Sequence, residues 1–199
     1  MNFLAHVYLS NDCEKRAIGN FIADSVRGKQ YLEFPKEVQY GILLHREIDT
    51  YTDAHSIWRK DKKLLVPRYN HYAAVIIDMF YDHFLAKNWS LYHQQPLADY
   101  AATFYASLQE NFELLPAKIQ NFLPIMIREN WFTCYETIDG LGYILSQMDR
   151  RTKGISKMSY ATEELREHYS ILATDFTQFF KELEDHVVLV QETPRFTAI

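Results

Sequence analysis

Cysteine is scarce in this chain of 199 residues, in which only Cys13 and Cys134 occur. The two lie far apart and neither belongs to a Cys-x-x-Cys pair, which argues against a disulfide framework and against a thiolate zinc site. A chain of this length buries enough surface to fold as one domain without such cross-links. We therefore expect a protein of a reducing, cytoplasmic compartment.

Glycine and proline are also few, with six of each. A many-stranded β architecture needs turn residues every ~8–12 positions, so their scarcity favours long helices. Hydrophobic residues make up 48% of the chain and aromatic residues 15%, which is ample for a packed core. These proportions predict an all-α protein that folds as a single-domain helical bundle over residues 1–199.

Excess positive charge and long apolar runs are lacking as well. The formal net charge is −5, which argues against general binding to nucleic acid, because that binding is driven by neutralisation of phosphates. The first ten residues, MNFLAHVYLS, are apolar, but they have no basic flank and include His6, so we expect no signal peptide there. No stretch of the sequence is long and apolar enough to span a bilayer.

The spacing of apolar side chains, together with capping residues and prolines, predicts the order of the helices. We expect helices over 12–27, 36–54, 56–66, 70–90, 96–115, 117–129, 134–149 and 159–187, with a loop at 150–156. The residue types that carry chemistry are concentrated in residues 1–95. We therefore expect residues 96–190 to form mainly a helical wall or lid.

Chemically active side chains are densest in two apolar helical segments. In a helix a spacing of four returns side chains to nearly the same face, so His45, Asp49 and Asp53 form one stripe. Asp78 and Asp82 form a second stripe on another helix. Burying an isolated carboxylate is costly, and a metal ion between the two helices would offset that cost.

The first expected long helix adds a third group of polar residues, because Asn20 and Asp24 also stand four apart. Hard divalent cations prefer carboxylate oxygens, and imidazole suits the borderline metals. A mixed set of His and Asp therefore indicates Mn²⁺, Mg²⁺ or a similar divalent cation rather than structural zinc. The alternative is that these residues form ion pairs and core hydrogen bonds within an interaction protein.

A basic segment lies between the two stripes. Its sequence, RKDKK at residues 59–63, carries four positive charges in an otherwise acidic protein, and Arg68 follows shortly afterwards. Such a run is usually a solvated helix face. Beside a metal site it would steer a phosphate or an acidic partner toward the chemistry.

Four segments of the chain resemble the acyl carrier protein phosphodiesterase family, also called acyl carrier protein hydrolase. They are MNFLAHVYLS, GNFIADSVRG, GILLHREIDTYTDAH and IIDMFYDHFLAKNW, in this order within residues 1–89. The resemblance implies an all-α fold similar to the HD-domain phosphohydrolases. It also implies a Mn²⁺-dependent reaction in which holo-acyl carrier protein is hydrolysed to the apo form and 4′-phosphopantetheine.

The resemblance also places individual side chains in the motif positions of the family. The metal ligands that it implies are His6, Asp24, His45, Asp49, Asp78 and Asp82. Where HD proteins have adjacent His and Asp in that order, this chain has Asp82 followed by His83. The exact ligand set, and which members orient the ligands instead of binding the ion, stays open at this point.

The chemistry of phosphodiester hydrolysis and the charge of the basic segment indicate catalytic and docking roles. Asp24 and His45 would act at the ion, Arg46 or Arg27 would hold a phosphate oxygen, and His83 would protonate the departing serine oxygen. The docking surface for the acidic carrier protein would consist of Arg59, Lys60, Lys62, Lys63 and Arg68.

Two other functions fit the same residues. An HD-like phosphohydrolase of nucleotides or small phosphate esters would need a similar set of carboxylates and imidazoles. A noncatalytic helical module that binds acidic carrier proteins would need only the basic surface.

Overall fold

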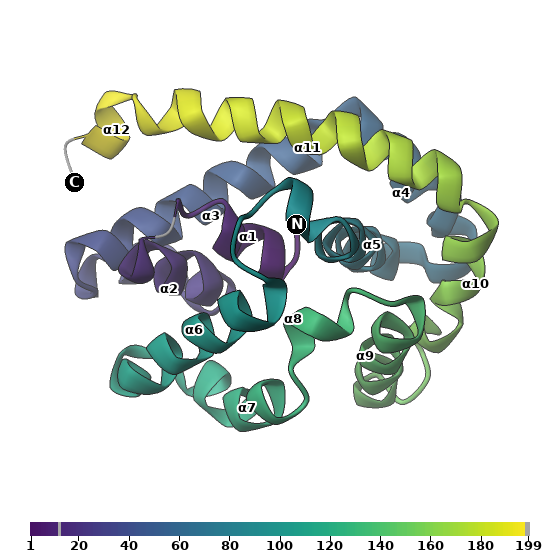
Figure 1. Ribbon diagram of the computed structural model, residues 1–199, viewed down its shortest axis with the longest axis horizontal. Helices are drawn as coiled ribbons and strands as arrows, with labels where there is room; N and C mark the ends of the chain where they lie inside the picture. The colour runs from purple at the N-terminus through teal and green to yellow at the C-terminus, as the bar shows by residue number, and fades with distance from the viewer. Residues whose placement is uncertain (12, 198–199) are drawn as a thin grey trace.

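The computed structural model describes residues 1–11 and 13–197, and within these ranges every regular element is helical (Figure 1). The α-helices are α1 (Phe3–Tyr8), α2 (Glu14–Ile22), α3 (Lys36–Ala54), α4 (Ser56–Tyr69), α5 (Ala73–Lys87), α6 (Leu97–Glu110), α7 (Ala117–Arg128), α8 (Trp131–Cys134), α9 (Ile138–Arg151), α10 (Ala161–Glu167), α11 (Tyr169–Gln191) and α12 (Pro194–Thr197). The all-α class is confirmed. Within the described ranges, no helix has both the length and the hydropathy that crossing a bilayer requires.

Helix boundaries follow the expected pattern closely in some places and depart from it in others. The helix expected over 36–54 begins and ends as predicted, in α3. The helix expected over 12–27 is shorter, because α2 ends at Ile22 and the chain continues as the 3-10 turn η1 (Ala23–Ser25). The expected start of that helix, at residue 12, lies outside the described residues.

Two further departures concern a proline and the long C-terminal helix. The helix expected to stop before Pro67 continues through it as α4, since a proline in the last turn removes only one backbone donor. It ends at Tyr69, and the next residue, Asn70, has a φ of 53° in the left-handed region. The single helix expected over 159–187 is interrupted at His168, which separates α10 from α11.

Helices α2 and α3 pack backbone against backbone through two glycines. A Cβ atom on Gly19 would lie 2.2 Å from the carbonyl oxygen of Val38, and one on Gly41 would lie 2.1 Å from that of Arg16. Any larger residue at either position would force the helices apart. This close approach brings Asn20 of α2 next to His45, one turn beyond Gly41 on α3.

The buried apolar side chains form one cluster that extends from Met1 to Phe196. Helix α5 lies at its centre and is buried on nearly all sides, while α11 crosses over α3, α4 and α5 (Figure 1). The short helix α1 contacts both α2 and α5. The segments that carry the predicted chemistry therefore meet in the interior of the molecule.

One buried carboxyl group lies at the junction of α4, α5 and α11. Asp61 accepts a hydrogen bond from the hydroxyl of Tyr81 at 2.8 Å, while its other oxygen, Oδ1, is buried without a hydrogen-bond partner. Next to it, Lys60 forms an ion pair with Asp175 of α11. Burial, together with the neighbouring Asp175 carboxylate, raises the pKa of Asp61 to about 7.

The close approach of α2 and α3 can be tested with Gly41→Ala. The added methyl group would overlap the carbonyl of Arg16, so we expect the free energy of unfolding to fall by ~1–3 kcal/mol or more. Gly142→Ala is the matched control, because a Cβ there lies 3.2 Å from a Thr162 methyl carbon, a contact that a small adjustment relieves. Urea unfolding of both variants measures the difference, and equal stability would contradict the packing described.

Asp61→Asn should change how stability depends on pH. The folded pKa, about 7, lies above the ordinary 3.8, so the folded chain keeps a proton that the unfolded chain has lost. The free energy of unfolding should therefore fall as pH rises from about 4 to about 7, with a slope of at most ~1.4 kcal/mol per pH unit from this group.

The substitution Asp61→Asn removes that contribution. The free energy of unfolding of the wild type minus that of the variant, measured by urea unfolding at a series of pH values, should therefore decrease over this interval. Glu167→Gln, at an exposed carboxylate, is the control and should leave the pH profile unchanged. Parallel profiles for wild type and Asp61→Asn would show that Asp61 is ionised in the folded chain throughout.

Candidate metal centre

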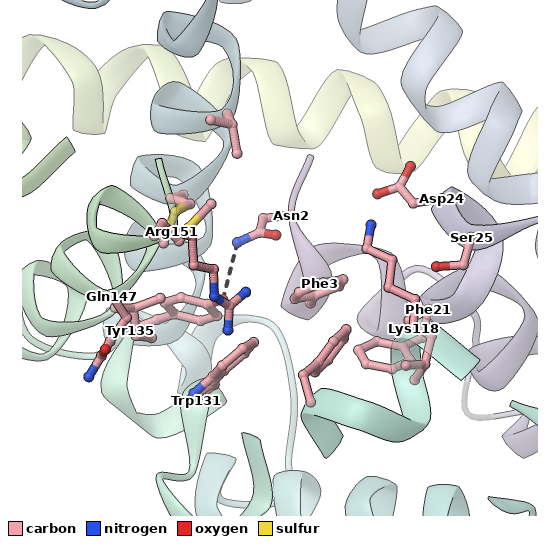
Figure 2. A pocket seen from close by; sticks show the side chains of 16 residues that line it. Asn2, Phe3, Phe21, Asp24, Ser25, Lys118, Trp131, Tyr135, Gln147 and Arg151 are labelled. Carbon is pink, nitrogen blue, oxygen red and sulfur yellow. Dashed lines mark hydrogen bonds between the residues drawn. The ribbon is translucent and has the colours of Figure 1, made fainter. Parts of the chain in front are cut away.

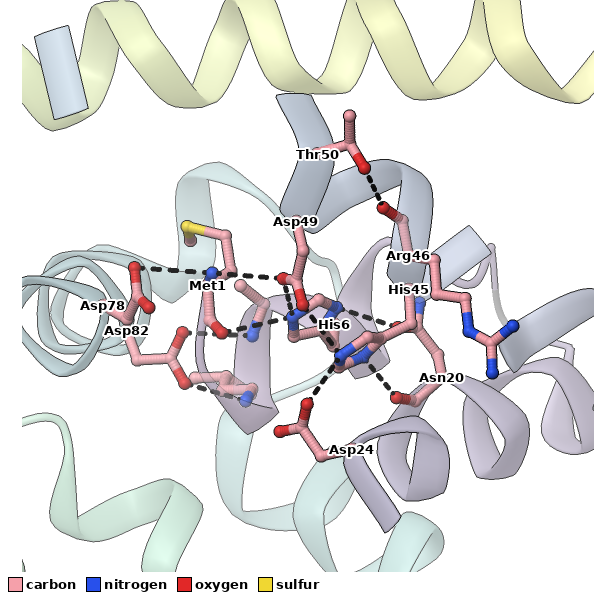
Figure 3. A network of polar contacts seen from close by, with 12 residues as sticks. Met1, His6, Asn20, Asp24, His45, Arg46, Asp49, Thr50, Asp78 and Asp82 are labelled. Atoms are coloured by element: carbon pink, nitrogen blue, oxygen red, sulfur yellow. Dashed lines mark hydrogen bonds and ion pairs between the residues drawn. The ribbon is translucent and has the colours of Figure 1, made fainter. Parts of the chain in front are cut away.

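Side chains from α1, α3 and the turn η1 converge on one point (Figure 3). Nε2 of His6 lies 3.2 Å from Oδ1 of Asp49, and Nε2 of His45 lies 3.0 Å from Oδ2 of the same carboxylate. Oδ1 of Asp24 lies 3.2 Å from Nε2 of His45. One potential ligand atom each from His6, His45 and Asp49 falls within 4.8 Å of the other two.

Asn20 orients both imidazole rings. Its side-chain oxygen lies 2.8 Å from Nδ1 of His6, and its backbone oxygen lies 2.8 Å from Nδ1 of His45. The amide orientation follows from the network, because Nδ2 of Asn20 donates to Ser10, whose hydroxyl donates to the carbonyl of His6. Since both partners of the rings are acceptors, each Nδ1 carries the proton.

The Nε2 atoms of the two rings therefore face oxygen atoms only. For His6 these are the carbonyl of Met1, at 3.1 Å, and Asp49; for His45 they are Asp24 and Asp49. A neutral imidazole presents a lone pair there, so either a proton or a cation must lie between nitrogen and oxygen. Imidazoles that donate Nδ1–H to an amide or carbonyl oxygen are the usual arrangement around a bound metal.

The electrostatics of the cluster favour positive charge at its centre. Burial and the neighbouring His45 lower the pKa of His6 to about 4, so this ring is neutral near pH 7. Burial alone would lower the pKa of His45, but hydrogen bonds to Asp24 and Asp49 raise it to about 9. The two histidines hold the pKa of Asp49 below its ordinary value despite its burial. This donor set, two imidazoles and two ionised carboxylates, fits a divalent cation.

The carboxylates of α5 make different contacts. Asp82 accepts hydrogen bonds from the backbone N–H groups of Leu4, at 2.8 Å, and Ala5, at 3.3 Å, and so holds the first turn of α1 against α5. Burial raises the pKa of Asp82 to about 7. Asp78 accepts the indole N–H of Trp58 at 2.8 Å.

The α-amino group of Met1 connects the two sets of carboxylates. It lies 3.4 Å from Oδ1 of Asp78 and 3.7 Å from Oδ1 of Asp49 (Figure 3). Asp78 and Asp82 therefore lie next to the cluster and fix the segment that carries His6.

The two remaining residues predicted as catalytic make contacts elsewhere. His83 lies 2.7 Å from the carbonyl oxygen of Tyr135 and 3.1 Å from the hydroxyl of Tyr169. Arg46 donates to the carbonyl of Val26, and Figure 3 shows its guanidinium directed away from the two rings.

The cations predicted for docking are largely paired within the chain. Besides the ion pair of Lys60 with Asp175, Arg68 pairs with Glu163 and Glu164 of α10. Arg59 donates to the carbonyl of Asp53, and the ammonium of Lys62 lies over the ring of Trp58. These contacts neutralise part of the charge on this face of α4.

A cavity of about 310 Å³ opens beside Asp24 (Figure 2). Its walls come from both halves of the chain, and those of the second half include Lys118, Phe122, Trp131 and Arg151. Sequence reasoning missed these residues, because they come from three separate helices and no spacing along the chain connects them. A basic or aromatic residue on an amphipathic helix is by itself too common a signal.

Comparison with known proteins identifies a family. A family model described as "Acyl carrier protein phosphodiesterase" matches residues 1–183. The protein named acyl carrier protein phosphodiesterase from Escherichia coli O6:H1 is 33% identical over 184 residues, covering 90% of this chain and 94% of that protein. The protein of the same name from Photorhabdus laumondii is 29% identical over 181 residues, covering 90% and 91% respectively. No solved structure matches the chain.

The orienting role of Asn20 generates a prediction about metal affinity. Asn20→Ala removes the acceptor for Nδ1 of His6, so we expect the affinity for Mn²⁺ to fall ~10–100-fold. Asn20→Asp keeps an acceptor at the same place and should recover most of that loss. Thermal unfolding across a Mn²⁺ titration, starting from chelated protein, measures the affinity because a ligand of the native state raises Tm. A wild-type Tm that no divalent cation shifts would rule out the metal centre.

Proposed function

The chain belongs to the acyl carrier protein phosphodiesterase family, and we propose that it hydrolyses the phosphodiester bond that joins 4′-phosphopantetheine to a serine of holo-acyl carrier protein. Water would supply the hydroxyl group, and the products would be apo-acyl carrier protein and 4′-phosphopantetheine. The observation that carries this proposal beyond the family name is the convergence of His6, His45, Asp49 and Asp24, the last of which also lines a cavity.

We assign the binding of a divalent ion, Mn²⁺ or Mg²⁺, to His6, His45, Asp49 and Asp24. When bound, such an ion polarises a phosphoryl oxygen and makes water more acidic. The support is that Nε2 of His6 and Nε2 of His45 both face ionised carboxylate oxygens, so that a bound cation would take the place of the proton that His45 holds there. Asp78 and Asp82 position α1 in this proposal, and direct coordination by either stays a prediction.

The chain's own groups would position and deprotonate the attacking water. Asp24 is the most exposed carboxylate of the cluster, with 68% of its side chain accessible, and it lines the cavity. Its Oδ1 contacts His45, which leaves Oδ2 to accept a proton from water. A hydrogen bond from His45 keeps the pKa of Asp24 below its ordinary value, so the carboxylate is ionised at neutral pH.

Protonation of the serine oxygen by His83 and phosphate binding by Arg46 stay predictions, since the contacts of both residues lie elsewhere. A cytoplasmic location likewise stays a prediction. Residues 96–190 would act as the wall of the cavity, which agrees with the contribution of α7, α8 and α9 to its lining.

Mass spectrometry of holo-acyl carrier protein tests the reaction directly. Incubation with Mn²⁺ should convert the holo mass to the apo mass, whereas incubation with a chelator should leave it unchanged. Activity on free nucleotides alone would indicate a phosphohydrolase of small esters, and tight binding without conversion would indicate a noncatalytic module.

Substitutions in the cluster should abolish turnover without unfolding the chain. We expect Asp24→Ala and Asp49→Asn each to lower kcat/KM by roughly 10²–10⁴-fold, because each removes a negative charge at the centre. Asp53→Asn, one turn further along α3 at an exposed position, should retain wild-type activity. Full activity in folded Asp24→Ala would exclude this carboxylate from the reaction.

Charge reversal on α4 tests the docking surface. Arg59→Glu combined with Lys63→Glu leaves the ion pair of Lys60 with Asp175 in place. We expect a several-fold increase in KM that shrinks at high salt, with little change in kcat, because the effect is on capture of an acidic protein. Lys36→Glu, on the first residue of α3, is the control. An unchanged KM for the double variant would place the docking surface elsewhere.

A further inference from the structure

The cavity beside Asp24 extends from this carboxylate, one member of the candidate metal cluster, to Arg151 (Figure 2). It lies between α1, α2, α5, α7, α8 and α9, and its volume of about 310 Å³ is at the lower end of the range for small-molecule pockets, ~300–1,000 Å³. A pocket of this volume beside Asp24 suits a slender substituent rather than a protein surface.

Aromatic rings form one wall of the cavity. The ring of Phe3 lies 4.9 Å from that of Phe21 and 6.0 Å from that of Phe122, and the ring of Phe122 is stacked on that of Trp131 at 5.6 Å. These side chains belong to α1, α2, α7 and α8 and hold one another in place. The wall is therefore pre-formed and apolar, as required for burying methyl and methylene groups.

Polar groups gather at the end where Asp24 lies. The hydroxyl of Ser25 is buried and has no hydrogen-bond partner in the described part of the chain, and Figure 2 shows it directed toward the cavity. A buried hydroxyl without a partner is costly, so a ligand that bonds to it would be favoured. The ammonium of Lys118 extends from α7 toward Asp24, and no ion pair within the described residues engages it (Figure 2).

We propose, resting on the function given above, that this cavity holds the pantetheine arm of the carrier protein. The 4′-phosphate lies at the end with Asp24, where Lys118 and the hydroxyl of Ser25 bind its oxygens. The branched dimethyl carbon and the methylenes pack on the aromatic wall, and the thiol end points toward Arg151. Only this direction brings the phosphorus atom to the metal centre, because the centre lies at one end alone.

This arrangement separates recognition of the arm from recognition of the carrier protein. The arm and its phosphate should then bind without any carrier attached. Two probes dissect the cavity, namely pantetheine, which lacks the phosphate, and pantetheine 4′-phosphate. Isothermal titration calorimetry of the full chain, with divalent ions chelated and again with Mn²⁺ present, measures both affinities without turnover.

Lys118→Met should weaken binding of pantetheine 4′-phosphate about 10-fold or more and leave binding of pantetheine unchanged, because the ammonium contacts only the phosphate. Lys36→Met, at an exposed lysine on α3, is the matched control and should change neither affinity. Equal affinities of wild type and Lys118→Met for the phosphorylated probe would overturn the assignment of Lys118.

Val75→Phe places a larger side chain at the wall of the cavity and should weaken binding of both probes about 10-fold or more. Ala106→Phe, which lines a different cavity next to α6, is the matched control. Ser25→Ala is a smaller change that keeps the test valid if the Val75→Phe variant does not fold. It should weaken binding of the phosphorylated probe.

Hydrolysis of holo-acyl carrier protein by the same preparations distinguishes a failure of the cavity assignment from a failure of the proposed reaction. An active wild-type protein that binds neither probe, or a Val75→Phe variant with unchanged KM and probe affinities, would overturn the cavity assignment and leave the proposed reaction intact. Probe binding that Lys118→Met and Val75→Phe weaken as stated would support the assignment, even if no carrier protein were hydrolysed.

Discussion

Asn20 accepts a hydrogen bond from each histidine of the candidate metal centre, and the arrangement of the site depends on this residue. Its side-chain oxygen fixes the ring of His6, and its backbone oxygen fixes that of His45. These two contacts require α2 to lie against both α1 and α3. The absence of a side chain at Gly19 and Gly41 makes the contact with α3 possible. The packing of three helices thereby determines which nitrogen of each ring carries a proton.

The carboxylates in and around the candidate site differ in function because their neighbours differ. Asp49 faces two imidazoles and is ionised, whereas Asp82 is surrounded by backbone N–H donors and its pKa is raised by burial. Asp61, on the other side of α5, shares its surroundings with Asp175 and affects stability rather than the site. Different partners offset the cost of removing each carboxylate from water: imidazoles for Asp49, backbone N–H groups for Asp82 and a hydroxyl for Asp61.

The two halves of the chain contribute different parts of the active region. Residues in the first half supply the imidazoles and carboxylates, and helices in the second half supply the basic side chains of the cavity and part of its aromatic wall. The family match extends over residues 1–183 and therefore includes both parts. In the proposed binding mode, the substrate arm passes along surfaces from both.

The sequence by itself determined the helical class, the exact extent of α3 and the grouping of His45 with Asp49, because these depend on local periodicity and on residues one turn apart. Only the tertiary structure decided that His6 joins them while Asp82 caps α1, and that Lys118 lies beside Asp24. Spacing within one helix specifies which side chains share a face, but not which face of another helix they meet. That choice depends on packing, here on two glycines and on a core formed by segments distant along the chain.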